Sequence, residues 1–128
     1  WESIGATTTV MDARRHDVAL ARVSHLPHAV ATALVNLSLR DGAIDVAGSG
    51  FADVTRVASG DPDMWTDILR TNRTAVIRAV DRLVAELNRL RQRLDDDDAE
   101  ALRAWLAAGK EARDEWIANR YRKKVLPP

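Results

Sequence analysis

The sequence predicts an all-α fold, a long-helix dimerisation domain preceded by one short strand. Apolar residues recur every three or four positions along most of the 128 residues, which is the period of an amphipathic helix. Strand-like sequence is confined to residues 1–11. One stripe with this period is longer than a small domain usually covers, and it consists of Trp65, Leu69, Asn72, Val76, Val80, Leu83, Leu87, Leu90 and Leu94. We therefore expect part of this stripe to pack against a second copy of the chain, giving a homodimer.

Length and composition exclude several classes of function. The 19 basic and 19 acidic residues balance, so we expect neither nucleic acid nor an anionic membrane surface as a partner. The chain has no cysteine, which excludes disulfides and thiolate catalysis and fits a cytoplasmic protein. No apolar stretch approaches the ~20 residues of a membrane helix, and no charged and apolar leader begins the chain. We therefore expect no membrane span.

Residues 1–11 differ from the rest of the chain. Small and β-branched residues follow Gly5, which is typical of a short strand. No second strand follows, and the chain begins with Trp1 rather than Met. We expect residues 1–11 to be the last strand and linker of a domain outside this sequence, and residues 12–128 to be the helical domain.

The first helix is expected from Asp12, a plausible N-cap, to about Arg40. Pro27 lies inside it and lacks a backbone donor, so the helix should kink or restart there. His25 and His28 are three residues apart and share a face. Zinc needs three or four ligands and no third follows at a helical spacing, so we expect no metal site. Core histidines satisfied by backbone carbonyls remain the alternative to a functional pair.

Three further helices are expected. A short one covers residues 51–58, after the turn Gly48-Ser49-Gly50. A long one begins at Asp61-Pro62, where a capping side chain precedes a proline, and continues to residue 94. The last covers residues 98–122, and the aspartate run before it favours the positive end of the helix dipole.

Residues 48–56 carry the most specific chemistry. Glycines ahead of a short helix let the backbone approach a ligand, and free amides at its start favour an anion. The guanidinium of Arg56 suits bidentate binding of a carboxylate. Asp53 lies three residues earlier on the same face and could orient Arg56. A solvent-exposed ion pair between the two is the competing interpretation.

Four motifs, spread over roughly residues 1–90, together resemble the C-terminal domain of prephenate dehydrogenases. The last helix matches no motif that we can name. The motifs are His16-Asp17, Ser24-His25-Leu26-Pro27-His28, Gly48-Ser49-Gly50-Phe51-Ala52-Asp53-Val54-Thr55-Arg56, and Ser59-Gly60-Asp61-Pro62-Asp63-Met64-Trp65 with Asp67-Ile68.

The resemblance implies an enzyme of tyrosine biosynthesis. Such enzymes couple hydride transfer from prephenate to NAD or NADP with loss of carbon dioxide, giving 4-hydroxyphenylpyruvate; some relatives prefer arogenate. Their N-terminal domain binds the dinucleotide and carries the catalytic histidine, and their helical domain dimerises through long helices. This sequence has no glycine-rich phosphate loop. We therefore expect no catalytic or cofactor-binding residue here, and no activity from this chain alone.

By the same resemblance, Arg56 binds a prephenate carboxylate and His28 lines the substrate pocket. Ser49 stands where many relatives carry glycine, and His25 is expected to be structural. The expected substrate-binding residues are His28, Ser49, Gly50, Asp53, Arg56 and Trp65.

Two other functions fit a helical chain of this size. One is a free-standing helical dimer with a binding or regulatory role. The other is a small all-helical enzyme of the chorismate mutase kind, which also binds a dicarboxylate through arginine side chains.

Overall fold

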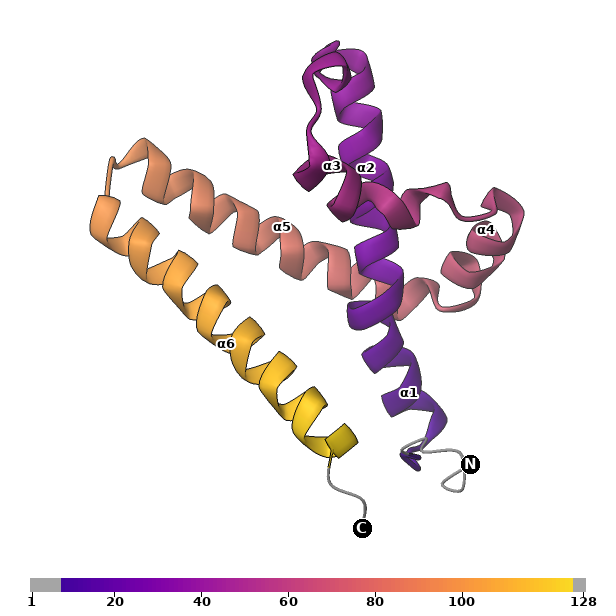
Figure 1. Cartoon of the computed structure of the whole chain (residues 1–128). Helices are drawn as coiled ribbons and strands as arrows, with labels where there is room; N and C mark the ends of the chain where they lie inside the picture. Colours follow the sequence, from indigo (N-terminus) through magenta and orange to yellow (C-terminus); the bar gives the residue numbers. More distant parts are fainter. Residues whose placement is uncertain (1–7, 126–128) are drawn as a thin grey trace. The chain divides into compact units, whose positions relative to one another are not determined.

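The computed structural model describes residues 8–125, and the side chains of residues 8–120. The described residues are helical and contain no strand, which confirms the predicted all-α class. The predicted N-terminal strand falls mostly on residues 1–7, outside the described part, and Thr8–Met11 has no regular secondary structure. The described residues form two compact units, residues 11–83 and residues 84–125 together with 8–10. In chain order the helices are α1 (Ala13–Leu20), η2 (Ala21–His25), α2 (Leu26–Arg40), η3 (Ala43–Val46), α3 (Ser49–Thr55), η4 (Arg56–Ser59), α4 (Pro62–Thr71), α5 (Arg73–Asp95) and α6 (Ala99–Val125) (Figure 1).

The elements α1, η2 and α2 follow one another without a break. Asp12 caps α1, as predicted, because its carboxylate accepts a hydrogen bond from the backbone N–H of Arg15 at 2.9 Å. The element η2 is one turn of π-helix, and the N–H of Leu26 donates to the carbonyl of Ala21, five residues back. Pro27 follows in the first turn of α2, where a missing donor costs little. The disturbance predicted at Pro27 is therefore observed as one π-helical turn, η2, immediately before it.

Three short elements, η3, α3 and η4, pack against α2. The chain turns at Gly42, whose positive φ of 68° favours glycine, and then forms η3 and α3. The predicted short helix over residues 51–58 corresponds to α3 and η4. Both α3 and η4 pack against α2, and η4 makes the more extensive contact (Figure 1).

The prediction of one continuous helix over residues 62–94 is wrong. The helix breaks at Asn72, whose φ of −100° and ψ of 26° are not helical, and α4 and α5 point in different directions (Figure 1). The side-chain Nδ2 of Asn72 donates to the carbonyl of Asp17 at 2.7 Å and lies 3.3 Å from Nδ1 of His25. Asn72 keeps the spacing of the apolar stripe but bonds to the first helix, and this long-range contact holds the break.

The core of the Met11–Leu83 unit is small. Its buried polar side chains are those of His25, His28 and Thr55. Leu26, Leu69 and Ala75 pack around part of the buried apolar cluster. No large side chain among the described residues is fully buried. The buried apolar residues are Ala21, Ala31, Val76 and Ala79.

In the second unit, a side-chain hydrogen bond joins α5 to α6. Asp98 begins α6, because its carboxylate accepts from the N–H of Ala101 at 2.9 Å, and the predicted last helix is confirmed. The indole Nε1 of Trp105 donates to the carboxylate of Glu86 at 2.6 Å, and Arg89 donates to the same carboxylate at 2.9 Å. The bond from Trp105 is the larger cause, and that from Arg89 the next, of a lowered pKa of Glu86.

One helical run in the described part, Ala13–Arg40, is long and apolar enough by length and composition to cross a membrane. The expectation that no stretch approaches that length is therefore wrong on this criterion. Core helices pass the same test, and this run presents the buried His25 and His28 to other helices of its unit. That the chain does not span a membrane stays a prediction.

Candidate functional site

His28 and Trp65 form an aromatic stack between α2 and α4. Their ring centroids lie 3.6 Å apart with an interplanar angle of 7°. The imidazole of His25 meets the same indole edge-on, at 6.5 Å and 82°. The two histidines therefore share a face, as their spacing predicted, and Trp65 contacts both.

His25 has the structural role that the resemblance implied. It is 7% exposed, and its Nδ1 lies beside the amide donor of Asn72. If Asn72 donates to Nδ1, the neutral ring carries its proton on Nε2. His25 thus ties the π-turn of the first helix to the break between α4 and α5.

A hollow of about 400 Å³ lies beside the stack. His28 is 7% exposed, and no hydrogen-bond partner reaches its buried Nδ1 among the described residues. A buried nitrogen without a partner loses free energy, so such a group is commonly completed by water or a ligand. The residues lining the hollow include His28, Thr32, Asn36, Gly60, Trp65 and Thr66.

The hollow suits a small organic molecule better than a metal ion. Its volume is in the range of small-molecule sites. The indole supplies an aromatic wall, while Thr32, Asn36 and Thr66 add hydroxyl and amide groups that can fix an orientation. Nowhere in the described part of the chain do three His, Cys, Asp or Glu residues gather as a metal site would require.

The other predicted residues lie on α3 and η4, outside this hollow. Ser49, Gly50, Asp53 and Arg56 are all exposed. A Cβ added at Gly50 would meet nothing within 4 Å, so packing within the described structure does not require glycine there. Asp53 and Arg56 form no ion pair within 4.0 Å, in contrast to the competing interpretation of their spacing.

The structure therefore brings two of the six predicted residues together. Arg56 begins η4, which packs on α2, yet η4 contributes Ala58 rather than Arg56 to the lining of the hollow. Substrate binding by Ser49, Gly50, Asp53 and Arg56 stays a prediction.

Sequence reasoning gave neither Gly60 nor Asn72 a functional role. Gly60 lies against the His28–Trp65 stack, and its signals were its place in the fourth motif and between a helix end and the Asp61-Pro62 start. Asn72 occupied an apolar position of the stripe, and a polar residue at such a position is the signal that could have marked the break.

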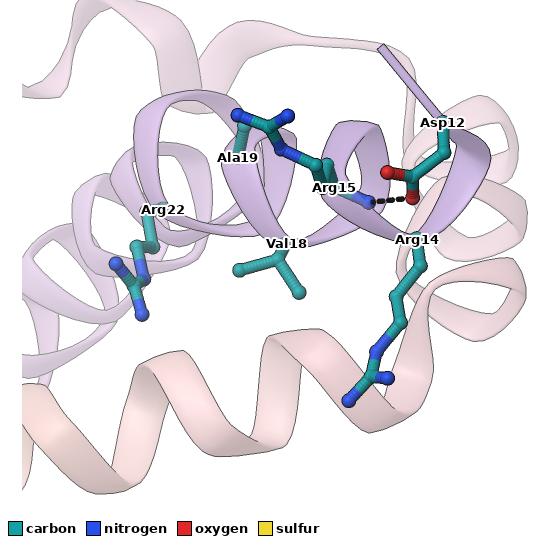
Figure 2. A pocket seen from close by; sticks show the side chains of 6 residues that line it. All are labelled: Asp12, Arg14, Arg15, Val18, Ala19 and Arg22. Carbon is teal, nitrogen blue, oxygen red and sulfur yellow. Dashed lines mark hydrogen bonds between the residues drawn. The ribbon is translucent and has the colours of Figure 1, made fainter.

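A second hollow, of about 600 Å³, lies along α1 and its continuation. Figure 2 shows Arg14 and Arg22 on the same side as Val18, with their guanidinium groups well apart, and Arg15 directed elsewhere. Because the cations do not converge, this surface does not form a single anion site. Its lining residues are Asp12, Arg14, Arg15, Val18, Ala19 and Arg22.

Comparisons with known proteins agree with the helical architecture. A cyclohexadienyl dehydrogenase of Zymomonas mobilis is 33% identical over 119 residues, which are 88% of this chain and 41% of that protein. The crystal structure of prephenate dehydrogenase from A. aeolicus, in complex with hydroxyphenyl propionate and NAD+, is 36% identical with a TM-score of 0.84. The match covers 90% of this chain and 42% of that one.

A Synechocystis arogenate dehydrogenase structure is also similar, at 26% identity and a TM-score of 0.80, over 90% of this chain and 44% of that one. The chain thus spans less than half the length of these relatives. The family model of the prephenate dehydrogenase dimerization domain matches residues 12–108. The chain therefore belongs to the prephenate dehydrogenase family, and its residues 12–108 are the dimerization domain of that family.

Proposed function

We propose that this chain is the dimerisation and substrate-binding domain of a cytoplasmic dehydrogenase that acts on prephenate or arogenate. For prephenate the reaction is oxidative decarboxylation to 4-hydroxyphenylpyruvate. Relatives named as prephenate, arogenate and cyclohexadienyl dehydrogenases support this. NAD or NADP would accept the hydride, on a part of the enzyme outside this sequence. This chain alone is expected to be inactive.

The observation that carries the proposal is the hollow beside the His28–Trp65 stack, which has an aromatic wall and hydroxyl and amide groups in its lining. The stack on Trp65 holds the imidazole of His28 in one orientation at the edge of the hollow, so this wall is pre-organised for a substrate. Arg56 is exposed and has no carboxylate partner among the described residues. Its guanidinium therefore has donors available for a substrate carboxylate.

Dimerisation is supported by an uncovered apolar stripe on α5. Its members recur at helical spacing, and each is between 38% and 57% exposed. Such a stripe on a family dimerization domain fits burial against a second copy. The stripe consists of Ile77, Val80, Val84, Leu87 and Leu94.

The substrate role is tested by Arg56→Ala in the complete enzyme, with reduction of the nicotinamide followed by absorbance. Loss of a bidentate carboxylate contact should raise the KM for prephenate or arogenate about 10-fold to 100-fold and leave the KM for the cofactor unchanged. Arg56→Lys should recover only part of the loss, because an ammonium cannot bind bidentately. An unchanged substrate KM would remove Arg56 from the site. Absence of turnover of both substrates by the unmodified protein would favour a non-catalytic dimerisation module.

A further inference from the structure

Gly60 closes one edge of the His28–Trp65 stack. A Cβ at this position would overlap Nε1 of Trp65, and it would lie 2.7 Å from Cδ1 of the same ring and 3.1 Å from Cε1 of His28. The backbone of Gly60 has a φ of −66° and a ψ of 154°, which any residue can adopt. Space, and not backbone conformation, therefore requires glycine at position 60.

The atoms that crowd Gly60 have little freedom to move. They belong to two rigid rings that are stacked on each other, and the indole also contacts the edge of His25. His25 and His28 are both 7% exposed, so displacement of Trp65 would disturb buried groups. A side chain at position 60 can therefore be accommodated only if the stack opens.

We propose that Gly60 is a positioning residue for substrate binding. Its missing side chain lets Trp65 lie flat against His28, and Trp65 then fixes the plane of the imidazole at the edge of the hollow. The inference rests on the proposed role of His28 in the substrate pocket. A hydrogen bond weakens steeply with misalignment, so a tilted imidazole would bind the same substrate group less well.

The test compares Gly60→Ala with Gly109→Ala in the complete enzyme. Gly109 lies in α6, where an added Cβ meets nothing within 4 Å, so the same chemical change there should leave kinetics unaltered. For Gly60→Ala, kcat/KM for prephenate or arogenate should fall about 10-fold to 100-fold, mainly through a raised KM. The KM for the nicotinamide cofactor should stay unchanged.

A second readout reports the ring itself. An imidazole stacked on an indole has its Cε1 proton shifted upfield by the ring current, and NMR with labelled histidine detects this shift. The His28 resonance is assigned from its loss in His28→Gln. The upfield shift should be present in the unmodified protein and in Gly109→Ala, and it should be lost in Gly60→Ala. Retention of the shift in Gly60→Ala would overturn the proposal.

A double-variant cycle separates positioning from general damage. If Gly60 acts through Trp65, then Gly60→Ala should cause no further rise in KM once Trp65→Ala has been made. An equal loss in both backgrounds would refute the mechanism. If the single variant Gly60→Ala fails to fold, the double variant Gly60→Ala/Trp65→Ala should still fold as well as Trp65→Ala does, because the clash is gone. A double variant that fails to fold when Trp65→Ala folds would count against the proposal.

Failure of this inference is distinguishable from failure of the proposed function. If the unmodified protein turned over neither prephenate nor arogenate, the proposed function would fail. The His28 resonance would still show whether Gly60 holds the ring, since that readout needs no substrate.

Discussion

Asn72 is predicted to hold the break between α4 and α5, and Asn72→Ala tests this directly. Its amide donates to the exposed carbonyl of Asp17 at 2.7 Å and lies 3.3 Å from Nδ1 of the buried His25. Water can replace the bond at Asp17, but the nitrogen of His25 would lose its partner inside the unit. A buried polar group left without a partner costs about 1–3 kcal/mol, and we expect the free energy of unfolding to fall by that amount.

The measurement is urea unfolding followed by near-UV circular dichroism. The midpoint should move to lower urea with an unchanged slope, because the substitution alters stability and not the area exposed on unfolding. Asn72→Asp should not restore the contact to Asp17, since a carboxylate cannot donate to a carbonyl oxygen.

Asn88→Ala is the matched control for Asn72→Ala. Asn88 lies in the second unit, in the part of α5 that follows Leu83. Its side chain is exposed and makes no hydrogen bond to a described side chain. Alanine has the higher helix propensity, so this control should leave stability unchanged or slightly increased. Equal unfolding midpoints for Asn72→Ala and the unmodified protein would refute the assigned role of Asn72.

Two further predictions concern α5. Leu87→Glu places a charge in the middle of the uncovered apolar stripe, so analytical ultracentrifugation should find that the proposed dimer dissociates at least about 10-fold more readily. Ala85→Glu, at an exposed position on another face of α5, should not have this effect. A dimer that tolerates Leu87→Glu would move the interface elsewhere. Trp105→Phe removes the larger cause of the lowered pKa of Glu86, so NMR titration should find that pKa raised toward its ordinary value. A carboxylate whose pKa is lower in the folded state than in the unfolded state stabilises the fold at pH values above its unfolded pKa. The contribution of Glu86 is therefore lost as pH falls from the ordinary carboxyl range through the lowered pKa. A pKa of Glu86 that is the same in Trp105→Phe as in the unmodified protein would contradict this account.

Three helix starts were predictable because their signals are local. Asp12, Asp61 and Asp98 each accept a hydrogen bond from a backbone N–H three residues ahead, so the residue and its consequence lie within one turn. The effect of Pro27 was also predictable in kind, since a missing donor must disturb any helix that contains it. That the disturbance takes the form of a π-turn depends on packing and could not be read from the sequence.

The break at Asn72 and the crowding at Gly60 depend on contacts that are distant in sequence. Asn72 bonds across 55 residues to Asp17 and 47 residues to His25. Gly60 is constrained by a stack whose second ring is contributed by His28, on another helix. Periodicity records only how often apolar residues recur, so it treated Asn72 as an ordinary member of the stripe.

In the candidate site, too, the sequence motifs named residues but did not say which of them the fold brings together. His28 and Trp65 were named through motif resemblance, and the fold brings their rings into contact. Arg56 was named in the same way, but the described structure leaves it exposed, outside the hollow that those rings border. A resemblance transfers residue roles from enzymes more than twice as long as this chain, so contacts that those roles require can involve groups outside this sequence.

The apolar residues of α5 lie partly in the core and partly on the surface. An apolar stripe predicts burial, but the pattern does not say whether the covering surface belongs to the same chain or to another. In the described residues, Val76 and Ala79 are buried within the unit, whereas Leu87 and Leu94 further along the helix remain at least half exposed. One uninterrupted period thus covers two different environments. Val76 and Ala79 build the local core, whereas the exposed residues are available to a partner, and the family to which the chain belongs supports our proposal that this partner is a second copy.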